Sequence, residues 1–325
     1  MRKSRNVAMW LMVVACAVPV LRAEPQGPLT MTQVDAWMSE LSNWGRWGRA
    51  DERGTLNLIT PAVRKQALKL ATDGVPVSLA HSIEKDAAPD NPRPLGQAMT
   101  LDAAGHAMDL YSIWYHGSLI THIDSLCHYS FEGKIYNGFD RSNIKEGVGC
   151  PQNDIEKQKT GIMTRGVLVD IPLMRKLPYL EPGTPVTVAD LEAWEKFSGV
   201  TIRSGDAVFL RTGRWARRAE KGAWNVAANA AGFHASVLPW LKKRDVALLG
   251  NDAVTDVQPS GVQGSPRPIH QVAIVAMGLP LVDVMDLEAV AKEAASRKRW
   301  TFLLTAAAVP VIGGTGFPLN PVATF

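Results

Sequence analysis

The side chains best suited to bind a metal ion gather in one short segment of the chain. They are His116, His122, Asp124 and His128, so three of the seven histidines lie close together around an aspartate. The apolar and β-branched residues of 119–125 predict a strand, on which side chains two positions apart point to the same face. We therefore expect His122 and Asp124 to converge on one divalent ion, because imidazole nitrogens and carboxylate oxygens are both common ligands.

The other two histidines could serve the same site. His128 follows the end of the predicted strand and could face the same cavity, and His116 would share the face of His122 if the strand extends back that far. A divalent ion can lower the pKa of bound water from about 15.7 towards 7 and polarise a carbonyl group, and a nearby imidazole can transfer protons. This chemistry suits hydrolysis of an amide, lactam or ester. A His-x-Asp pair can also be a simple hydrogen-bonded pair on a polar face.

Motifs for other kinds of catalysis are missing from the sequence. It contains no Gly-x-Ser-x-Gly nucleophile elbow, no Gly-x-Gly-x-x-Gly dinucleotide motif and no phosphate-binding Walker loop. Cys127 precedes His128, but adjacent residues on a strand point to opposite faces, which disfavours a thiol nucleophile. Metal-dependent chemistry is the interpretation that these absences favour.

The pattern Thr-His-x-Asp-x-x-x-His at residues 121–128 resembles the signature of the cyclase-like metal-dependent hydrolases, a family that includes kynurenine formamidase and isatin hydrolase. Further segments resemble this family in the same order along nearly the whole mature chain: residues 47–57, 136–138, 210–213 and 313–321. The resemblance implies an α/β fold of the cyclase-like, swivelling β/β/α kind, in a single domain with a mixed sheet. It also implies a homo-oligomer that hydrolyses a small substrate such as an aromatic amide or lactam.

The resemblance assigns roles to particular residues. His122 and Asp124 match metal ligands, and His128 matches a histidine that relays protons beside the metal, while His116 is a second catalytic candidate. Members of the family with two zinc ions carry a further histidine four positions before the one that His122 matches, where this chain has Ser118. This departure favours one ion over two.

A downstream ligand is expected near residue 271. Two-metal members use a histidine and a glutamate twelve residues apart, and the matching pair here is Gln271 and Asp283. With His122, Asp124 and Gln271 the donors would be one nitrogen and two oxygens, which suits manganese, with zinc as the alternative. A shift of one residue would make His270 the ligand instead, and Gln271 could also be a plain core residue of its helix.

Strands alternate with helices in the second half of the chain. Apolar runs predict strands at 166–171, 206–211, 246–249, 281–284 and 300–311, and the helices predicted between them cover 187–197, 234–243, 269–277 and 286–297. Upstream, a helix is expected from Thr60-Pro61 to about Ala71, and residues 83–106 are expected to form a long surface excursion. The alternation predicts an α/β domain with a largely parallel sheet.

The first 23 residues have the pattern of an export signal. A basic start is followed by a short apolar run and small residues, so cleavage after Ala17 or Ala23 is expected, and Cys16 could alternatively carry a lipid anchor. The apolar run is too short to span a membrane, and a buried N-terminal helix is the other interpretation. The predicted organisation is a signal peptide over 1–23 and one periplasmic domain over 24–325.

Charge excludes several kinds of partner. The chain has 35 basic and 31 acidic residues, but the predicted signal carries four basic residues and no acidic one, so 31 of each sign remain. No nucleic-acid or membrane-surface role follows from that balance, and a small-molecule substrate is the expected partner. The mature chain would keep Cys127 and Cys150, for which free thiols are expected and a disulfide is the alternative.

Two alternatives to a hydrolase stay open. A metal-assisted lyase or dehydratase could use the same ion to stabilise an enolate. A periplasmic small-molecule-binding protein could keep the fold without turnover, as the departures at Ser118, Gln271 and Asp283 allow. A product formed by elimination would indicate the first, and ligand binding that is unchanged when His128 becomes alanine would indicate the second.

Overall fold

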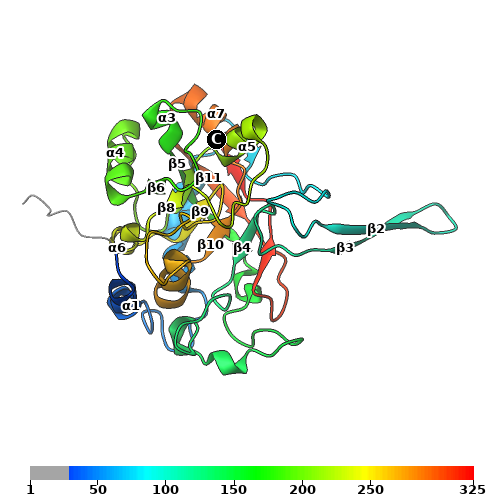
Figure 1. Cartoon of the computed structure of the whole chain (residues 1–325), viewed down its shortest axis with the longest axis horizontal. Helices are drawn as coiled ribbons and strands as arrows, with labels where there is room; N and C mark the ends of the chain where they lie inside the picture. Colours follow the sequence, from blue (N-terminus) through cyan, green and yellow to red (C-terminus); the bar gives the residue numbers. More distant parts are fainter. Residues whose placement is uncertain (1–28) are drawn as a thin grey trace, which may run out of the picture.

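The computed structural model describes residues 29–325 as one α/β domain built around a large sheet (Figure 1). The predicted export signal, its cleavage positions after Ala17 and Ala23, and Cys16 lie outside the described residues. Within the described range, no helix is long and apolar enough to cross a membrane.

A mixed sheet of nine strands forms the centre of the molecule. The strands are β1 Pro76–Ser78, β4 His122–Asp124, β5 Ile162–Asp170, β7 Ala207–Arg211, β9 Leu248–Asn251, β10 Leu281–Asp283, β11 Thr301–Ala306, β12 Gly316–Pro318 and β13 Val322–Thr324. Their order is β1-β13-β11-β5-β7-β9-β10-β4-β12. The four strands from β5 to β10 run parallel, whereas the pairs on either side are antiparallel. A separate small sheet joins β6 (Pro185–Val186) to β8 (Gly232–Phe233).

The parallel strands are buried on both faces, which explains why the sequence shows them as unbroken apolar runs. Every residue of β7, β9 and β10 is buried, and so are the last five residues of β5. The strands predicted at these four places are confirmed, with altered ends. The strand predicted over 300–311 ends at Ala306, which pairs with Ile162, the first residue of β5.

Helices connect the strands. They are α1 Met31–Glu40, α2 Pro61–Leu68, α3 Ile171–Arg175, α4 Val188–Ser198, α5 Arg214–Lys221, α6 Leu238–Lys243, the π-helix η6 His270–Met277 and α7 Glu288–Arg297. Short 3-10 turns cover Gly54–Leu58, Tyr136–Gly138, Arg141–Asn143, Ile155–Gln158 and Ala235–Val237. As predicted, α2 begins after Thr60, whose side chain caps the helix by accepting from the backbone nitrogen of Val63. Gly278 ends η6 in a left-handed conformation with φ 62°.

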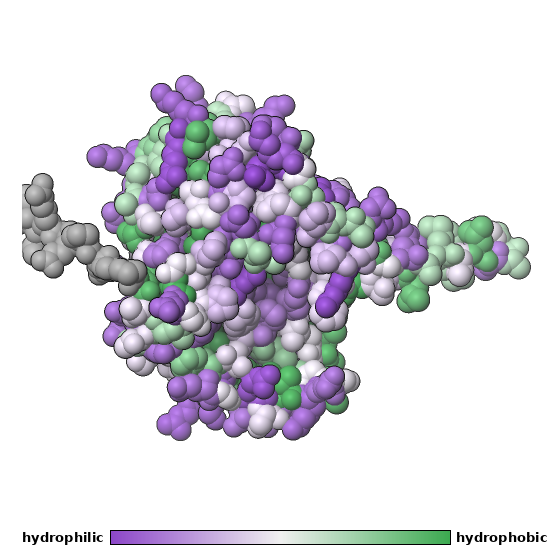
Figure 2. All heavy atoms as spheres, in the orientation of Figure 1, coloured by the Kyte–Doolittle hydropathy of each residue, from purple (hydrophilic) through white to green (hydrophobic). Residues whose placement is uncertain are grey.

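The region predicted as a surface excursion leads into a hairpin that projects from the body, here called the arm, residues 96–112 (Figure 1). Its strands β2 (Gly96–Leu101) and β3 (Ala107–Ser112) pair with each other, and within the described residues with no strand of the central sheet. Leu101 and Leu110 are exposed on it, and Figure 2 shows apolar residues along this projection. The predicted self-association of the chain stays a prediction.

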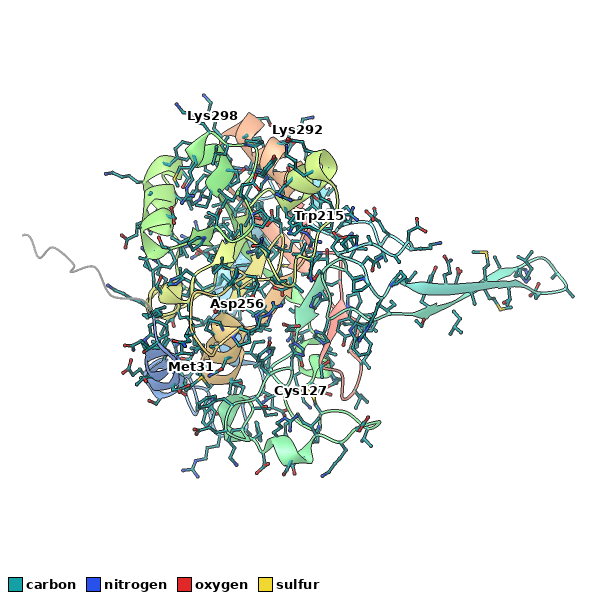
Figure 3. All side chains as sticks on the ribbon, viewed as in Figure 1. Met31, Cys127, Trp215, Asp256, Lys292 and Lys298 are labelled. Carbon is teal, nitrogen blue, oxygen red and sulfur yellow. A yellow bond between two sulfur atoms is a disulfide. The ribbon has the colours of Figure 1, made fainter. Side chains whose placement is uncertain are left out.

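Cys127 and Cys150 form a disulfide, so the expectation of free thiols is wrong. The loop 131–149 returns Cys150 to the end of β4, where Cys127 N donates to Asn153 O and Cys150 N donates to Gly313 O. These backbone contacts leave the two Cα atoms 6.5 Å apart, within the usual span of a disulfide. Cys127 lies on the side of the body away from α3, α4 and α7 (Figures 1 and 3).

Candidate metal centre

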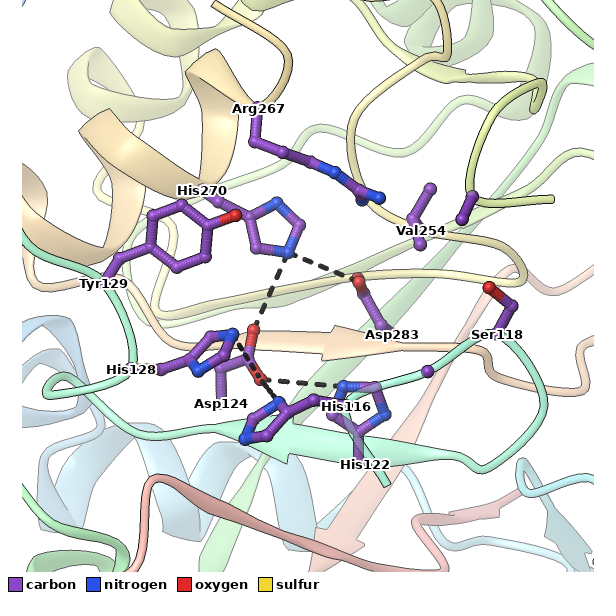
Figure 4. A pocket seen from close by; sticks show the side chains of 12 residues that line it. His116, Ser118, His122, Asp124, His128, Tyr129, Val254, Arg267, His270 and Asp283 are labelled. Carbon is purple, nitrogen blue, oxygen red and sulfur yellow. Dashed lines mark ion pairs between the residues drawn. The ribbon is translucent and has the colours of Figure 1, made fainter. Parts of the chain in front are cut away.

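A cavity of about 220 Å³ lies beside β4 (Figure 4). Its ionisable side chains come from β4, from the loops on both sides of that strand, from the start of η6 and from β10. They include His116, His122, Asp124, His128, His270 and Asp283. The fold therefore brings together every residue predicted for the site except Gln271.

The position of β4 between two other strands fixes the two predicted ligands. β4 pairs antiparallel with β10, so that His122 lies opposite Asp283, and with β12, so that Asp124 lies opposite Gly316. A Cβ atom at position 316 would lie 2.2 Å from the carbonyl oxygen of Ile123, so this close pairing requires glycine. The alternation along β4 then directs His122 and Asp124 to the same face, as the sequence predicts.

Asp124 is the centre of the cluster and is only 1% exposed. Four imidazoles face its carboxylate: His116 Nδ1 at 3.1 Å, His122 Nε2 at 3.6 Å and His128 Nε2 at 4.0 Å from Oδ1, and His270 Nε2 at 3.7 Å from Oδ2. Burial opposes ionisation, but the nearby histidines hold the pKa of Asp124 well below its usual value. The carboxylate is therefore charged.

Neither carboxylate oxygen of Asp124 has a hydrogen-bond partner among the described residues. Nδ1 of His116 is also buried without a hydrogen bond, although it approaches Asp124 Oδ1 to 3.1 Å. A buried charge without hydrogen bonds is costly unless an opposite charge compensates for the lost hydration. A divalent cation would provide that compensation, so the donor set fits a metal ion.

Hydrogen bonds from the surrounding chain orient the imidazoles. Nδ1 of His122 lies 2.8 Å from the carbonyl oxygen of Ile120, to which it donates, so Nε2 is left to face Asp124. Nε2 of His116 lies 2.9 Å from Thr315 Oγ1, which leaves Nδ1 facing Asp124. The strand does not extend back to His116, which reaches the cavity from the loop before β4. Outer contacts of this kind fix the tautomer of metal-binding histidines.

His116, His122 and Asp124 can share one ion, because one ligand atom from each lies within 4.8 Å of those of the other two. Two imidazole nitrogens and a carboxylate oxygen form a donor set that zinc accepts in catalytic sites. The predicted set with Gln271 was richer in oxygen. Without that second oxygen donor the geometry does not choose between manganese and zinc, and the identity of the ion stays a prediction.

His270 faces the cavity and Gln271 does not, so the prediction of Gln271 as a ligand gives way to the alternative register. Neighbouring residues of a helix point in directions roughly 100° apart, so His270 and Gln271 leave the helix on different sides. Asp256 holds His270 in its position towards the cavity, since its carboxylate accepts from Ile269 N at 2.7 Å and from His270 Nδ1 at 2.5 Å. Burial opposes protonation of His270, yet Asp256 and Asp283 raise its pKa well above the usual value.

Asp283 and Ser118 are the other two positions at which the sequence departs from the two-metal pattern. Asp283 Oδ2 lies 3.4 Å from His270 Nε2, and its Oδ1 accepts from the backbone nitrogen and the hydroxyl of Thr255 at 2.9 and 2.5 Å. Ser118 lines the cavity, and its carbonyl oxygen accepts a hydrogen bond from the buried Arg214 guanidinium. Arg214 thereby holds the loop that carries His116.

His128 lies in the cavity beside His116. Its ring stacks on that of His116, with centroids 3.8 Å apart and planes 1° from parallel. Burial lowers the pKa of His128 to about 4, against the attraction of Asp124, so this imidazole is neutral near pH 7. Tyr129 lies beside it, 5.1 Å away between ring centroids, and burial raises the pKa of the phenol so that it stays protonated.

Sequence reasoning missed three residues of the site: Tyr129, Asp256 and Arg267. The adjacency of Tyr129 to His128 was a usable signal. So was the three-residue spacing from Arg267 to His270, which places both on one side of a helical turn. No signal pointed to Asp256, because it meets His270 through a loop of irregular structure.

Residues 77–256, more than half of the chain, match the sequence model of a family described as putative cyclase. A solved structure described as a novel cyclase is 28% identical, with a TM-score of 0.78 over 88% of this chain and 98% of that chain.

Two more distant structures share the fold. Isatin hydrolase A from Ralstonia solanacearum is 19% identical, with a TM-score of 0.56 over 81% of this chain and 97% of its own. A predicted metal-dependent hydrolase from Bacillus stearothermophilus is 13% identical, with a TM-score of 0.50 over 77% of this chain and 97% of its own. A comparison with curated proteins gave no match. On the evidence of its sequence, its fold and the residues gathered around β4, the chain belongs to the putative cyclase family.

Proposed function

We propose that the protein is a metal-dependent hydrolase of small amides, lactams or esters, with one divalent ion held by His116, His122 and Asp124. The observation that carries this proposal is the buried Asp124 carboxylate, which four imidazoles surround and which has no hydrogen-bond partner in residues 29–325. Membership of the putative cyclase family supports it, as does the fold shared with isatin hydrolase A and with a predicted metal-dependent hydrolase.

A divalent ion at this place would supply a lowered pKa for water and a polarised substrate carbonyl. The side chains of the cavity supply the rest of the chemistry. His128, neutral and 4.0 Å from Asp124 Oδ1, takes a proton from the attacking water and returns it to the leaving nitrogen or oxygen. Tyr129, which stays protonated, donates a hydrogen bond to a substrate oxygen.

The cavity and the N-terminus narrow this proposal further. A volume of about 220 Å³ lies below the usual range of pockets for drug-sized ligands, so the substrate is a small molecule. The basic and apolar start of the sequence supports export as part of the same proposal, with the mature protein acting in the periplasm.

The first test is elemental analysis of protein purified without added metal or chelator. His122→Ala is compared with a matched control, His81→Ala, because His81 also pairs with carboxylates (Asp286 and Glu84) but lies outside the cavity. We expect about one zinc or manganese ion per chain in the wild type and in His81→Ala, and none in His122→Ala. A wild type that holds no stoichiometric ion, even after incubation with zinc and manganese, would refute the proposal and favour a binding protein without turnover.

The second test is a screen of amides, lactams and esters with the metal-loaded protein. We expect products that have gained one water molecule. Products formed by elimination would instead indicate the lyase or dehydratase alternative.

A further inference from the structure

One cation on the cavity wall has no part in the chemistry described above. Arg267 is half-buried, lines the cavity, and extends its guanidinium between His270 and Val254 (Figure 4). Within residues 29–325, this guanidinium makes no hydrogen bond, ion pair or contact with an aromatic face. A half-buried cation loses part of its hydration, and here no protein group replaces it.

Other arginines in the interior have carboxylate partners. Arg211 bonds the carboxylates of Asp170 and Glu288, and the fully buried Arg214 pairs with Asp90. Arg267 thus stands apart as a guanidinium that faces the cavity and has no carboxylate of the described chain beside it. A ligand with a negative charge is the partner that this position fits.

The backbone at Arg267 is held firmly. Proline residues flank it on both sides, and Gln258 Nε2 donates to the carbonyl oxygen of Pro266 at 2.7 Å. Two residues further on, Ile269 N donates to Asp256. The backbone from which the Arg267 side chain extends is therefore fixed relative to His270. Binding an anion there costs less conformational entropy than binding at a mobile loop.

The charge balance of the cavity points the same way. Its acidic side chains are Asp124 and Asp283, and a divalent ion would offset their two charges. Arg267 then leaves the cavity with a net positive charge at the end away from β4. Val254 lies beside Arg267 and makes that end of the cavity partly apolar, which suits the body of a small molecule between its charged group and its reacting carbonyl.

We propose that Arg267 binds a carboxylate of the substrate, so that the substrates are small carboxylic acids that also carry the amide, lactam or ester bond to be hydrolysed. A guanidinium matches a carboxylate with two parallel hydrogen bonds, which fixes orientation as well as charge. This inference rests on the proposed hydrolysis and names its substrate class. The carboxylate lies on Arg267, and the reacting carbonyl lies towards His122 and Asp124.

The test compares two probes of nearly equal shape, benzoate and benzamide, by calorimetric titration into the metal-loaded protein. The variants are Arg267→Gln, Arg267→Lys and a matched control, Arg93→Gln. Arg93 is an exposed cation stacked on Trp114, near the cavity but outside its lining. We expect the wild type and Arg93→Gln to bind benzoate more tightly than benzamide by roughly 10- to 100-fold. We expect Arg267→Gln to lose this preference and Arg267→Lys to keep part of it.

Three results would overturn the inference. The wild type would show no preference for benzoate, the preference would survive in Arg267→Gln because benzoate binds the metal alone, or Arg93→Gln would lose it equally.

Metal content measured on the same samples separates this inference from the proposed function. Wild-type metal content in Arg267→Gln shows that the variant is folded, because the ion needs residues from β4 and its loops. A wild type without metal defeats the hydrolase proposal, yet the dependence of benzoate binding on Arg267 can still be measured on that protein.

Discussion

The two walls of the cavity are built in different ways. The β4 wall, formed by His116, His122, Asp124 and His128, comes from one continuous segment of the chain. The second group, here called the opposite wall, consists of Arg267 and His270 at the start of a helix and of Asp283 on β10, the strand that pairs with β4. The walls also differ in how their polar atoms are satisfied.

In the opposite wall, the imidazole and the carboxylate have protein partners, because His270 bonds Asp256 and Asp283 accepts two hydrogen bonds from Thr255. The β4 wall leaves the Asp124 carboxylate without any hydrogen bond from the described residues. This difference indicates that the β4 wall needs a bound cation for its own stability, whereas His270 and Asp283 of the opposite wall already have protein partners. The following predictions test this difference between the two walls, from the largest expected effect to the smallest.

Asp124→Asn is expected to abolish metal binding, because it removes the one charged oxygen donor of the β4 wall. Asp283→Asn is the matched control and should keep most of the metal, since Asp283 already has internal partners. Elemental analysis measures both. Chelator should lower the melting temperature of the wild type and of Asp283→Asn, because both hold the ion, and should leave that of Asp124→Asn unchanged. Equal metal loss in the two variants would show that the two walls do not differ in their dependence on a bound ion.

His128→Gln is expected to lower kcat by about 10²- to 10⁴-fold while the protein keeps its metal, because glutamine cannot accept the proton. The measurement uses the best substrate from the amide, lactam and ester screen. Tyr129→Phe, which removes one hydroxyl next to the same ring, should have a smaller effect. If His128→Gln loses the metal as well, His128 is a ligand and not a proton-transfer group.

Asp256→Asn is expected to destabilise the fold by about 3 to 5 kcal/mol, because it breaks a buried pair and weakens the start of η6. Urea unfolding measures this change, and the metal content should stay near that of the wild type. The opposite result, lost metal with unchanged stability, would make His270 a ligand and move the ion towards the opposite wall.

Replacing both Cys127 and Cys150 by serine is expected to cost about 2 to 4 kcal/mol of stability, through the larger freedom of the unfolded chain. Metal content should not change, because β4 is held by its pairing with β10 and β12 and not by the disulfide. Unfolding curves of the oxidised wild type and the double variant give the difference. Lost metal in the folded double variant would show that the disulfide shapes the β4 wall.

The two walls also explain what the sequence could reveal about the site. His122 and Asp124 were predictable because strand alternation alone puts them on one face. His270 was not separable from Gln271, because one residue of helix register lies beyond what apolar spacing can define, and the contact that sets it comes from Asp256.

The fold likewise contains elements that the sequence predicted and elements that it did not. The parallel strands were predictable because each lies in a run of buried residues, even β10 with its three residues. The strands β1, β12 and β13 also have three residues each, but they are only partly buried and show no such run. Helix α5 was missed because most of its residues are charged, so its sequence carries no continuous apolar stripe. The disulfide depended on where the loop 131–149 returns, which spacing between cysteines does not define.

The geometry of the arm has a consequence for how this chain can change over evolution. Its first and last residues, Gly96 and Ser112, are paired across the hairpin, so the chain leaves the body and re-enters it at nearly the same point. Insertions or deletions made in matched pairs of residues would alter the reach of the arm without moving either end. Its length and surface can therefore diverge between relatives while His116, a few residues further along the chain, keeps its place in the cavity.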